Sequence, residues 1–145
     1  MHMRFSAALV PLIFAGAAVA LPGVQTTDVI KRHRLMLQIR DASTTLVAMA
    51  RGETVFDADR AARLAGLLRE DAAAIPIHFE FQNSDPDSRA RPEVWADWTG
   101  FEKAAARSEA AAAALQTEAP EPLRRGIEAL QRTCQNCHRR YRFGK

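Results

Sequence analysis

The sequence predicts an all-α protein, an antiparallel four-helix bundle, on three observations. Alanine is abundant and glycine is sparse, with only 7 glycines among 145 residues. Apolar residues recur at helical spacings of three and four, and no alternating run rich in Val, Ile and Thr predicts a strand. Short connections rich in proline, glycine and aspartate separate four such segments, which is typical of a bundle with antiparallel neighbours.

Residues 1–20 have the pattern of a secretory signal peptide. One arginine precedes an almost unbroken apolar run, and Ala18-Val19-Ala20 fits a cleavage site. The run is too short to cross a membrane. We therefore expect export, cleavage after Ala20, and a mature domain over 21–145 without a membrane span. The length of this domain suits a single hydrophobic core.

Two helices and an irregular segment are expected in the first part of this domain. The first helix is predicted over 27–51, where a threonine can cap its start and Gly52 can end it. The second follows Asp57, a good N-cap, and is expected to stop at Ile75-Pro76. The segment up to residue 91 contains a cluster of Asn, Ser, Asp and Pro, which indicates turns.

The third helix is predicted over 92–115, with Pro92 at a permitted first-turn position. Trp95, Trp98 and Phe101 recur at spacings of three and therefore share one face of the helix. Such an aromatic stripe is more often core than part of a cofactor site. It suits both roles in a protein that encloses a large apolar group.

The fourth helix is expected over 123–143, after two prolines break the chain, and it carries Cys134-Gln135-Asn136-Cys137-His138. C-x-x-C-H is the attachment signal for a c-type haem. Thiols three residues apart lie on one helix face about one turn apart, so both can bond to the two vinyl groups along one haem edge. His138 is then placed to bind the iron as proximal ligand. Arg142 lies one turn further along the same face.

Other uses of the two cysteines fit the sequence less well. A thioredoxin-like redox pair follows a strand and opens a helix, whereas Cys134 and Cys137 lie late in a helical chain. A structural zinc site needs four ligands, and these cysteines with His138 have no obvious fourth. A disulfide in a purely structural bundle remains an alternative, but it does not explain the adjacent histidine. We therefore predict one haem c bound covalently through both cysteines.

Met36 is the leading candidate for the second axial ligand. In an up-down-up-down bundle the start of the first helix lies beside the end of the fourth. At 1.5 Å per residue, Met36 and His138 lie roughly 13 Å and 10 Å from that end, and Met49 lies about 20 Å further along and is expected in the core. A thioether suits haem iron, and a His/Met pair raises the reduction potential. Two alternatives remain: Met36 only packs on the distal side, or His33, expected on the helix surface, binds instead.

Four segments together match a known pattern. They are Arg32-x-x-x-Met36, Ala50-Arg51-Gly52-Glu53, Arg91-Pro92-Glu93-Val94-Trp95 and Cys134-x-x-Cys137-His138-x-x-Tyr141-Arg142. Through these segments the whole mature domain resembles the class II c-type cytochromes, known as the cytochrome c′ group. The last segment is the most specific, because C-x-x-C-H near the C-terminus distinguishes this family from cytochromes with N-terminal haem attachment.

The resemblance implies a haem enclosed between the helices, with His138 as proximal ligand and Arg32 near the propionates. High-spin members of the family leave the distal position empty and bind nitric oxide or carbon monoxide. Low-spin members place a methionine there and are similar to electron carriers. Met36 resembles the low-spin, cytochrome c-556-like branch. In addition, this sequence has His33 at a position where the high-spin pattern commonly has a glutamine.

We therefore predict a periplasmic monohaem electron-transfer protein without catalytic residues, six-coordinate through His138 and Met36. The alternative is a five-coordinate protein that binds nitric oxide or carbon monoxide. With 20 Lys and Arg against 17 Asp and Glu, the charge is too balanced for a nucleic-acid-binding domain.

Two hypotheses concern partner proteins. Basic residues at the predicted haem end would steer acidic redox partners to the haem edge. These residues are Lys31, Arg32, Arg34, Arg139, Arg140, Arg142 and Lys145. In addition, high-spin relatives often form dimers through their first two helices, so a homodimer is a further hypothesis from the resemblance.

Overall fold

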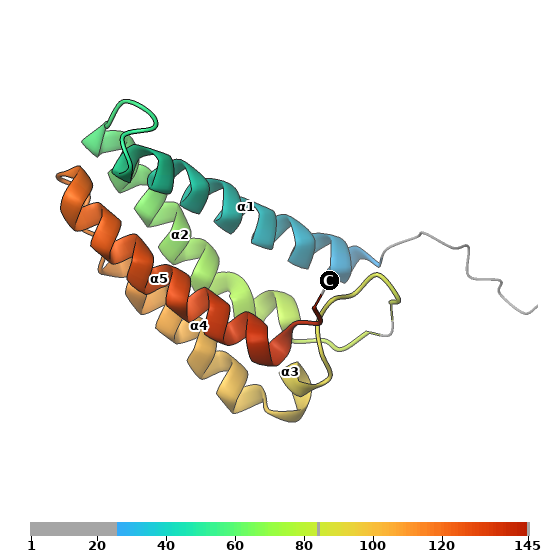
Figure 1. Ribbon diagram of the computed structural model, residues 1–145. Helices are drawn as coiled ribbons and strands as arrows, with labels where there is room; N and C mark the ends of the chain where they lie inside the picture. Colours follow the sequence, from blue (N-terminus) through green and yellow to red (C-terminus); the bar gives the residue numbers. More distant parts are fainter. Residues whose placement is uncertain (1–25, 84, 145) are drawn as a thin grey trace, which may run out of the picture.

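The computed structural model describes residues 26–83 and 85–144. Within these ranges the chain forms five α-helices and no strand, as Figure 1 shows. They are α1 (Thr27–Ala50), α2 (Ala58–Phe79), α3 (Glu93–Ala96), α4 (Trp98–Ala113) and α5 (Pro120–Tyr141). The predicted all-α fold is confirmed. The expected signal peptide lies outside the described residues.

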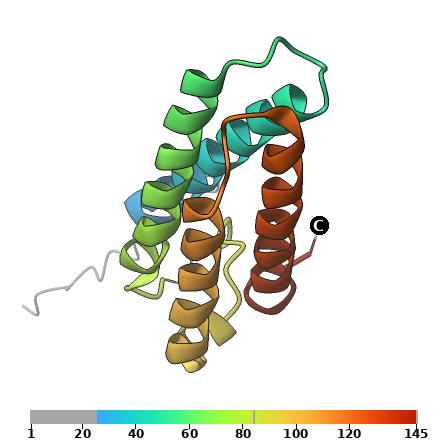
Figure 2. The ribbon, with the colours of Figure 1, turned by 90° about the vertical axis from the view of Figure 1, so that its left-hand side faces the viewer.

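The four long helices form an antiparallel bundle, and α3 is a single turn at one end (Figures 1 and 2). Helix α2 packs against α1 and α4, while α5 packs against α4 and α1. Along α1 and α5, one end of the pair is closely packed and the other is splayed apart (Figure 1). None of the helices described here has the length and apolar character that a membrane crossing requires.

The end of α1 and the start of α2 are formed by the residues that the sequence predicted. Helix α1 ends where Gly52 takes a φ of 71°, and the Gly52 N–H donates to the Met49 carbonyl at 3.2 Å. Glycine adopts this left-handed conformation at no steric cost. The Asp57 carboxylate caps α2 by accepting from the Arg60 N–H at 2.9 Å.

The predicted stop of α2 at Pro76 is wrong, since the helix continues to Phe79. His78 therefore lies within α2 and not in an irregular loop. Two side chains from elsewhere satisfy carbonyls at this end: Arg32 Nε donates to the His78 carbonyl at 2.8 Å, and Trp95 Nε1 donates to the Phe79 carbonyl at 2.7 Å. These bonds stabilise the last turn of α2, where Pro76 has no backbone N–H to donate within the helix.

The predicted third helix is in fact two helices, interrupted at Asp97. This residue has φ −126° and ψ 55°, and its carboxylate caps α4 by accepting from the Gly100 N–H at 3.3 Å. A Cβ atom at Gly100 would overlap the Asp97 side chain. The aspartate can therefore fold over the helix start only because residue 100 is a glycine.

Helix α5 starts earlier than predicted because its prolines lie in the first turn, where a missing N–H costs no helical hydrogen bond. It ends at Tyr141, beside an isolated antiparallel bridge between Ala90 and Arg142. The Arg91 N–H donates to the Tyr141 carbonyl and the Phe143 N–H to the Arg89 carbonyl, both at 2.9 Å. The loop before α3 thus holds the segment after α5.

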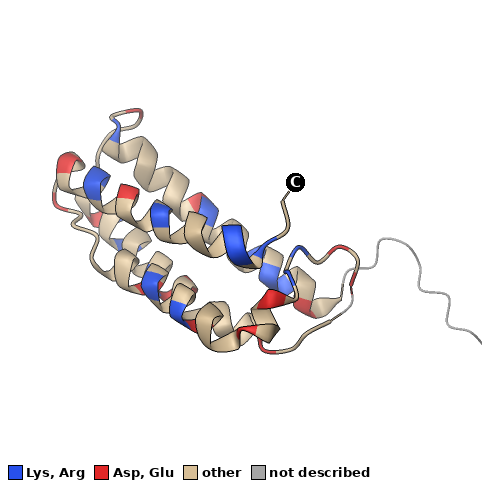
Figure 3. Ribbon diagram, turned by 60° about the horizontal axis from the view of Figure 1, so that its bottom comes forward, with Lys and Arg blue, Asp and Glu red and all other residues tan. Residues whose placement is uncertain are grey.

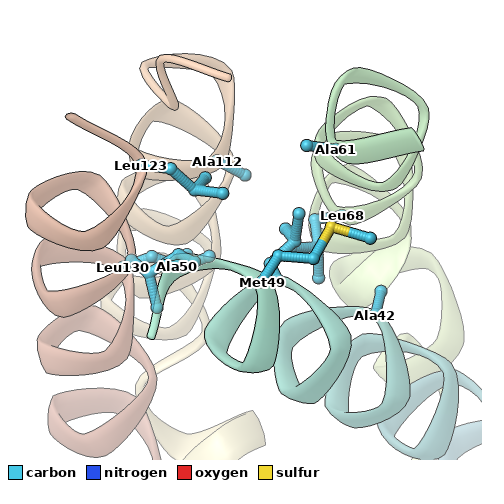
Figure 4. Packing of buried hydrophobic residues seen from close by; sticks show 10 residues of the cluster. Ala42, Met49, Ala50, Ala61, Leu68, Ala112, Leu123 and Leu130 are labelled. Carbon is cyan, nitrogen blue, oxygen red and sulfur yellow. The ribbon is translucent and has the colours of Figure 1, made fainter. Parts of the chain in front are cut away.

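Two clusters of buried residues form the core. The first, in Figure 4, fills the closely packed end of the bundle and includes the fully buried Leu46, Met49 and Leu123. The prediction that Met49 is a core residue is confirmed. The second cluster draws residues from all five helices, among them Leu35 of α1, Val94 of α3 and Tyr141 of α5.

Candidate haem site

A cavity of about 430 Å³ lies among α1, α2, α4 and α5. Its walls are mainly apolar, with Leu68, Ala72, Ile75, Phe79, Phe101 and Leu130 among the lining side chains. Cavities of this size and character are typical of cofactor sites. The cavity lies at the splayed end of the bundle, next to the second core cluster, and we take it as the candidate haem site.

All six site residues predicted from the sequence line this one cavity. Arg32 and Met36 reach it from α1, Cys134, Cys137 and His138 reach it from α5, and Arg142 lies just after α5. The fold thus brings together two regions that are about 100 residues apart in the sequence. The competing residue His33 also lines the cavity, although it is exposed as expected.

The two cysteines are free and half-buried. Burial raises the pKa of both thiols, and the pKa of Cys137 reaches about 11, with the neighbouring Cys134 as the second cause. Both thiols are therefore uncharged at neutral pH. Among the described residues no group of three or more His, Cys, Asp and Glu side chains could hold a metal ion.

His138 lies on the last turn of α5, between the cavity and the surface. Desolvation lowers the pKa of its imidazole, and the positive charge of Arg142 lowers it further. Both effects favour the neutral form of the imidazole, although the residue is exposed. A neutral imidazole has the nitrogen lone pair that a haem iron requires.

Arg32 is 4% exposed and ties α1 to the end of α2. Besides its bond to the His78 carbonyl, its Nη2 donates to the Phe81 carbonyl. Its guanidinium carbon lies 5.0 Å from the Phe79 ring centroid and 5.4 Å from that of Trp95. Burial lowers the pKa of the guanidinium. The prediction that Arg32 is one of the basic residues that steer redox partners is wrong, because its side chain is buried.

One nitrogen of Arg32 distinguishes this site from a purely structural one. Nη1 is buried and has no hydrogen-bond partner in the protein. A buried cationic donor without an acceptor is costly. A haem propionate in the cavity would supply the missing acceptor, so the residues present fit the group that the cysteine motif predicts.

Three arginines besides Arg32 line the cavity and form its basic part, and Figure 3 shows the distribution of basic and acidic residues over the ribbon. Arg40, Arg89 and Arg142 line the cavity itself. The sequence analysis missed Arg40 and Arg89. Arg40 carried a signal, because it follows Met36 by one turn on the same face, but the position of Arg89 depends on the fold of a loop.

Two of the arginines predicted to steer redox partners bind neighbouring side chains of this protein. Arg140 pairs with Asp97 at 2.7 Å, and Arg139 donates to the side chain of Asn136. Lys31 and Arg34 do not line the cavity. Lys145 lies outside the described residues.

A polar network holds the end of α5 against the start of α4. Tyr141 is 5% exposed, and its hydroxyl donates to the Asp97 carboxylate at 2.8 Å. The Tyr141 ring meets Phe101 edge-on, with centroids 5.3 Å apart. The hydrogen bond from Tyr141 is the main reason why the pKa of Asp97 is lowered, with Arg140 adding to the effect. The network fixes the turn that carries His138.

The bundle and its site define a class of protein. A helical bundle whose last helix carries C-x-x-C-H against an apolar internal cavity is the architecture of a four-helix c-type cytochrome. The family model described as Cytochrome C' matches residues 28–142. The chain therefore belongs to the cytochrome c′ family, whose members are monohaem proteins with covalently bound haem c that transfer electrons or bind gases.

Individual relatives agree with this assignment. The chain is 26% identical to cytochrome c′ of Rhodopseudomonas palustris over 142 residues, which cover 96% of both chains. It is 30% identical to cytochrome c-556 of Agrobacterium tumefaciens over 122 residues, which cover 81% of this chain and 98% of that protein. The solved structure of Rhodopseudomonas palustris cytochrome c′ matches with a TM-score of 0.74 at 26% identity, covering 83% of this chain and 99% of that one.

Proposed function

We propose that the protein is a periplasmic electron carrier with one six-coordinate haem, bound through Cys134 and Cys137 and ligated by His138 and Met36. The observation that supports this proposal is that Met36, on α1, lines the same cavity as the C-x-x-C-H segment on α5. No other methionine of the described residues lines this cavity. A His/Met pair raises the haem potential towards the range of electron carriers.

The haem supplies the one-electron chemistry, and the residues of this chain bind it and tune it. The apolar walls exclude water from the cavity, which favours the less charged, reduced state. The lowered pKa of His138 favours the neutral imidazole that iron needs, and the turn that Tyr141 and Asp97 fix positions it. Arg32 and Arg142, which line the cavity, would compensate the charges of the propionates.

A second candidate function is gas binding, with Met36 packing on the distal side without bonding. Similarity to a protein named cytochrome c′ along 96% of the chain favours it. Met36 is half-buried and packs against the second core cluster, which is compatible with either role. The two candidates differ in the coordination number of the iron.

The deciding experiment is the absorption spectrum of the mature holoprotein in both oxidation states, with and without carbon monoxide. We expect a low-spin spectrum, little carbon monoxide uptake, and a weak far-red sulfur-to-iron band that disappears in Met36→Ala. The matched control is His33→Ala, one turn away on the same helix, which should retain that band. A high-spin spectrum with ready carbon monoxide binding would overturn the proposal in favour of gas binding. A low-spin spectrum that survives Met36→Ala but not His33→Ala would assign the sixth ligand to His33.

We further propose that acidic redox partners approach the basic mouth of the cavity. Arg40, Arg89 and Arg142 line the cavity, although Arg40 pairs with Asp41 at 2.8 Å, and an opposite charge on the partner would accelerate encounter at low salt. Neutralising Arg89 and Arg142 together should slow electron transfer to an acidic partner and flatten its salt dependence. Equal rates for the variant and the unaltered protein at low salt would contradict this mode of approach.

A homodimer is a related proposal. On α1, Ile30 and Leu37 are two turns apart and are 41% and 47% exposed, so both present apolar surface along one helix face. Sedimentation velocity should then show a dimer that Ile30→Glu dissociates. A monomer at micromolar concentration would exclude it.

A further inference from the structure

We propose that a groove on the outside of the bundle binds lysine or arginine side chains of a basic electron-transfer partner. The groove lies between the end of α2 and the helices α3 and α4. This inference rests on the proposed electron-carrier function, and it adds a second face for docking beside the basic mouth of the cavity.

The groove has a volume of about 570 Å³ and combines apolar walls with two acids. Its lining residues are Pro76, Ile77, Glu80, Trp95, Trp98 and Glu102. Ile77 is 72% exposed, although it is a large apolar residue. Exposed apolar surface bordered by charged residues is typical of interaction sites, and Trp is enriched among the residues that dominate binding energy.

Both tryptophan rings are held in place by the fold. Trp95 is fixed by the hydrogen bond from its Nε1 to the Phe79 carbonyl at 2.7 Å. Trp98 packs on Phe101, with ring centroids 5.6 Å apart and an interplanar angle of 38°. A partner would therefore meet a preorganised aromatic surface, which reduces the entropic cost of binding.

The charge of the groove determines what it can bind. Glu80, the residue directly after α2, and Glu102, on α4, are exposed and line the groove. Among the described residues, neither carboxylate forms an ion pair. Indole faces attract cations, and two carboxylates beside them complement an ammonium or guanidinium group. A basic side chain is therefore the occupant that fits.

The groove is connected to the haem cavity by aromatic side chains in contact. Trp98 lines the groove and packs on Phe101, and Phe101 packs on Tyr141 with centroids 5.3 Å apart. Phe101 and Tyr141 line the cavity. Two rings, Trp98 and Phe101, therefore lie between a partner in the groove and the haem cavity. Arg89 and Arg142, which line the cavity, would repel a basic partner, so the groove offers it the favourable approach.

Docking can be tested without any electron transfer. The chain has two tryptophans, Trp95 and Trp98, and both lie in the groove, so 5-fluorotryptophan labelling of the holoprotein places two ¹⁹F signals there. Trp98→Phe identifies which is which. The probe is the tripeptide tri-lysine amide at low ionic strength. We expect a saturable shift of the Trp98 signal.

The carboxylates provide the decisive comparison. In the double variant Glu80→Gln/Glu102→Gln, affinity for tri-lysine should fall roughly fourfold per carboxylate, the effect of unit charges about 5 Å apart in water. The matched control is Glu118→Gln, in the loop after α4 at the other end of the bundle, which should bind as the unaltered protein does. A Trp98 signal that does not move, or equal affinities in the double variant and the control, would overturn the proposal.

A kinetic measurement links the groove to electron transfer. The reduced holoprotein is mixed with ferric mitochondrial cytochrome c, a lysine-rich oxidant, and separately with ferricyanide. The double variant should react more slowly with the basic protein at low salt and at an unchanged rate with ferricyanide. Unchanged rates with both oxidants would overturn the docking role. Failure of the unaltered protein to reduce either oxidant would instead refute the electron-carrier function, while the ¹⁹F titration would still decide docking.

Discussion

Replacing Arg32 by Met should destabilise the protein by much more than replacing any exposed arginine of α1. Arg32 is 4% exposed and binds the His78 and Phe81 carbonyls at the end of α2. Methionine has a similar length and can fill the space, but it cannot donate. The substitution therefore leaves two carbonyls without partners at the point where α2 runs on past Pro76.

The magnitude follows from these contacts. Two hydrogen bonds from a charged donor contribute about 1.5–3 kcal/mol each, and the contacts with the Phe79 and Trp95 rings add about 0.5–1 kcal/mol each. Burial of the guanidinium, which lowers its pKa, offsets several kcal/mol of this sum. A net loss of about 2–4 kcal/mol is expected. Arg32→Lys should recover little, because a single ammonium cannot reach both carbonyls as the planar guanidinium does.

The assay is guanidinium-induced unfolding of the holoprotein, followed by far-ultraviolet circular dichroism and by haem absorbance. The matched control is Arg34→Met, an exposed position on the same helix, where a change within about 0.5 kcal/mol is expected. If Arg32→Met is no less stable than Arg34→Met, the bonds to the α2 carbonyls do not stabilise the fold and the reasoning fails. A change in reduction potential alone, with unchanged stability, would assign Arg32 only to the haem.

Three further predictions concern the frame around the site. Gly100→Ala should lower the Tm in calorimetry by roughly 4–8 °C, because a Cβ there displaces the Asp97 cap. Gly66→Ala, with open space around the new Cβ in mid-helix, should instead stabilise the fold by about 0.5–1 kcal/mol. If Gly100→Ala were the more stable of the two variants, the argument would be refuted. Tyr141→Phe removes the hydrogen bond that most lowers the pKa of Asp97. A lowered pKa gives a stabilisation that is present above the unfolded pKa of about 4 and is lost as the pH falls through the folded pKa. In urea unfolding, the variant should therefore have a lower free energy of unfolding than the unaltered protein at about pH 7, with a difference that shrinks towards about pH 3. A difference that does not depend on pH would contradict this. Leu123→Ala, at a residue that is fully buried in the first core cluster and does not line the cavity, should cost about 2–5 kcal/mol and leave the haem spectrum unchanged. An altered spectrum would show that packing at Leu123 is coupled to the haem site.

The sequence predicted those features that local chemistry determines. Gly52 and Asp57 mark helix ends through their own backbone and side-chain bonds, and both predictions are confirmed. The errors arise where distant residues decide. Pro76 fails to end α2 because Arg32 binds the carbonyl of His78, 46 residues away from it along the chain, and periodicity within one helix carries no signal of such a contact.

The same distinction applies to the site. The C-x-x-C-H spacing and the level of Met36 along its helix predicted side chains that do line one cavity. The second role of Arg32 and the presence of Arg89 at the cavity mouth could not be predicted, because both depend on how the loop after α2 folds. Iron ligation by His138 and Met36 remains a prediction, and the spectra proposed above test it.

The pairing of the chain on both sides of Ala90 with the segment after α5 has a consequence for motion. His138 lies three residues before the end of its helix, where a terminal turn ordinarily frays. The bonds of Arg91 to Tyr141 and of Phe143 to Arg89 close that turn from outside. Amide hydrogen exchange at Arg91 and Phe143 should therefore be slow for a loop and a terminus. The backbone, and not only the iron bond, would then keep the imidazole in register, so that little rearrangement accompanies a change of oxidation state.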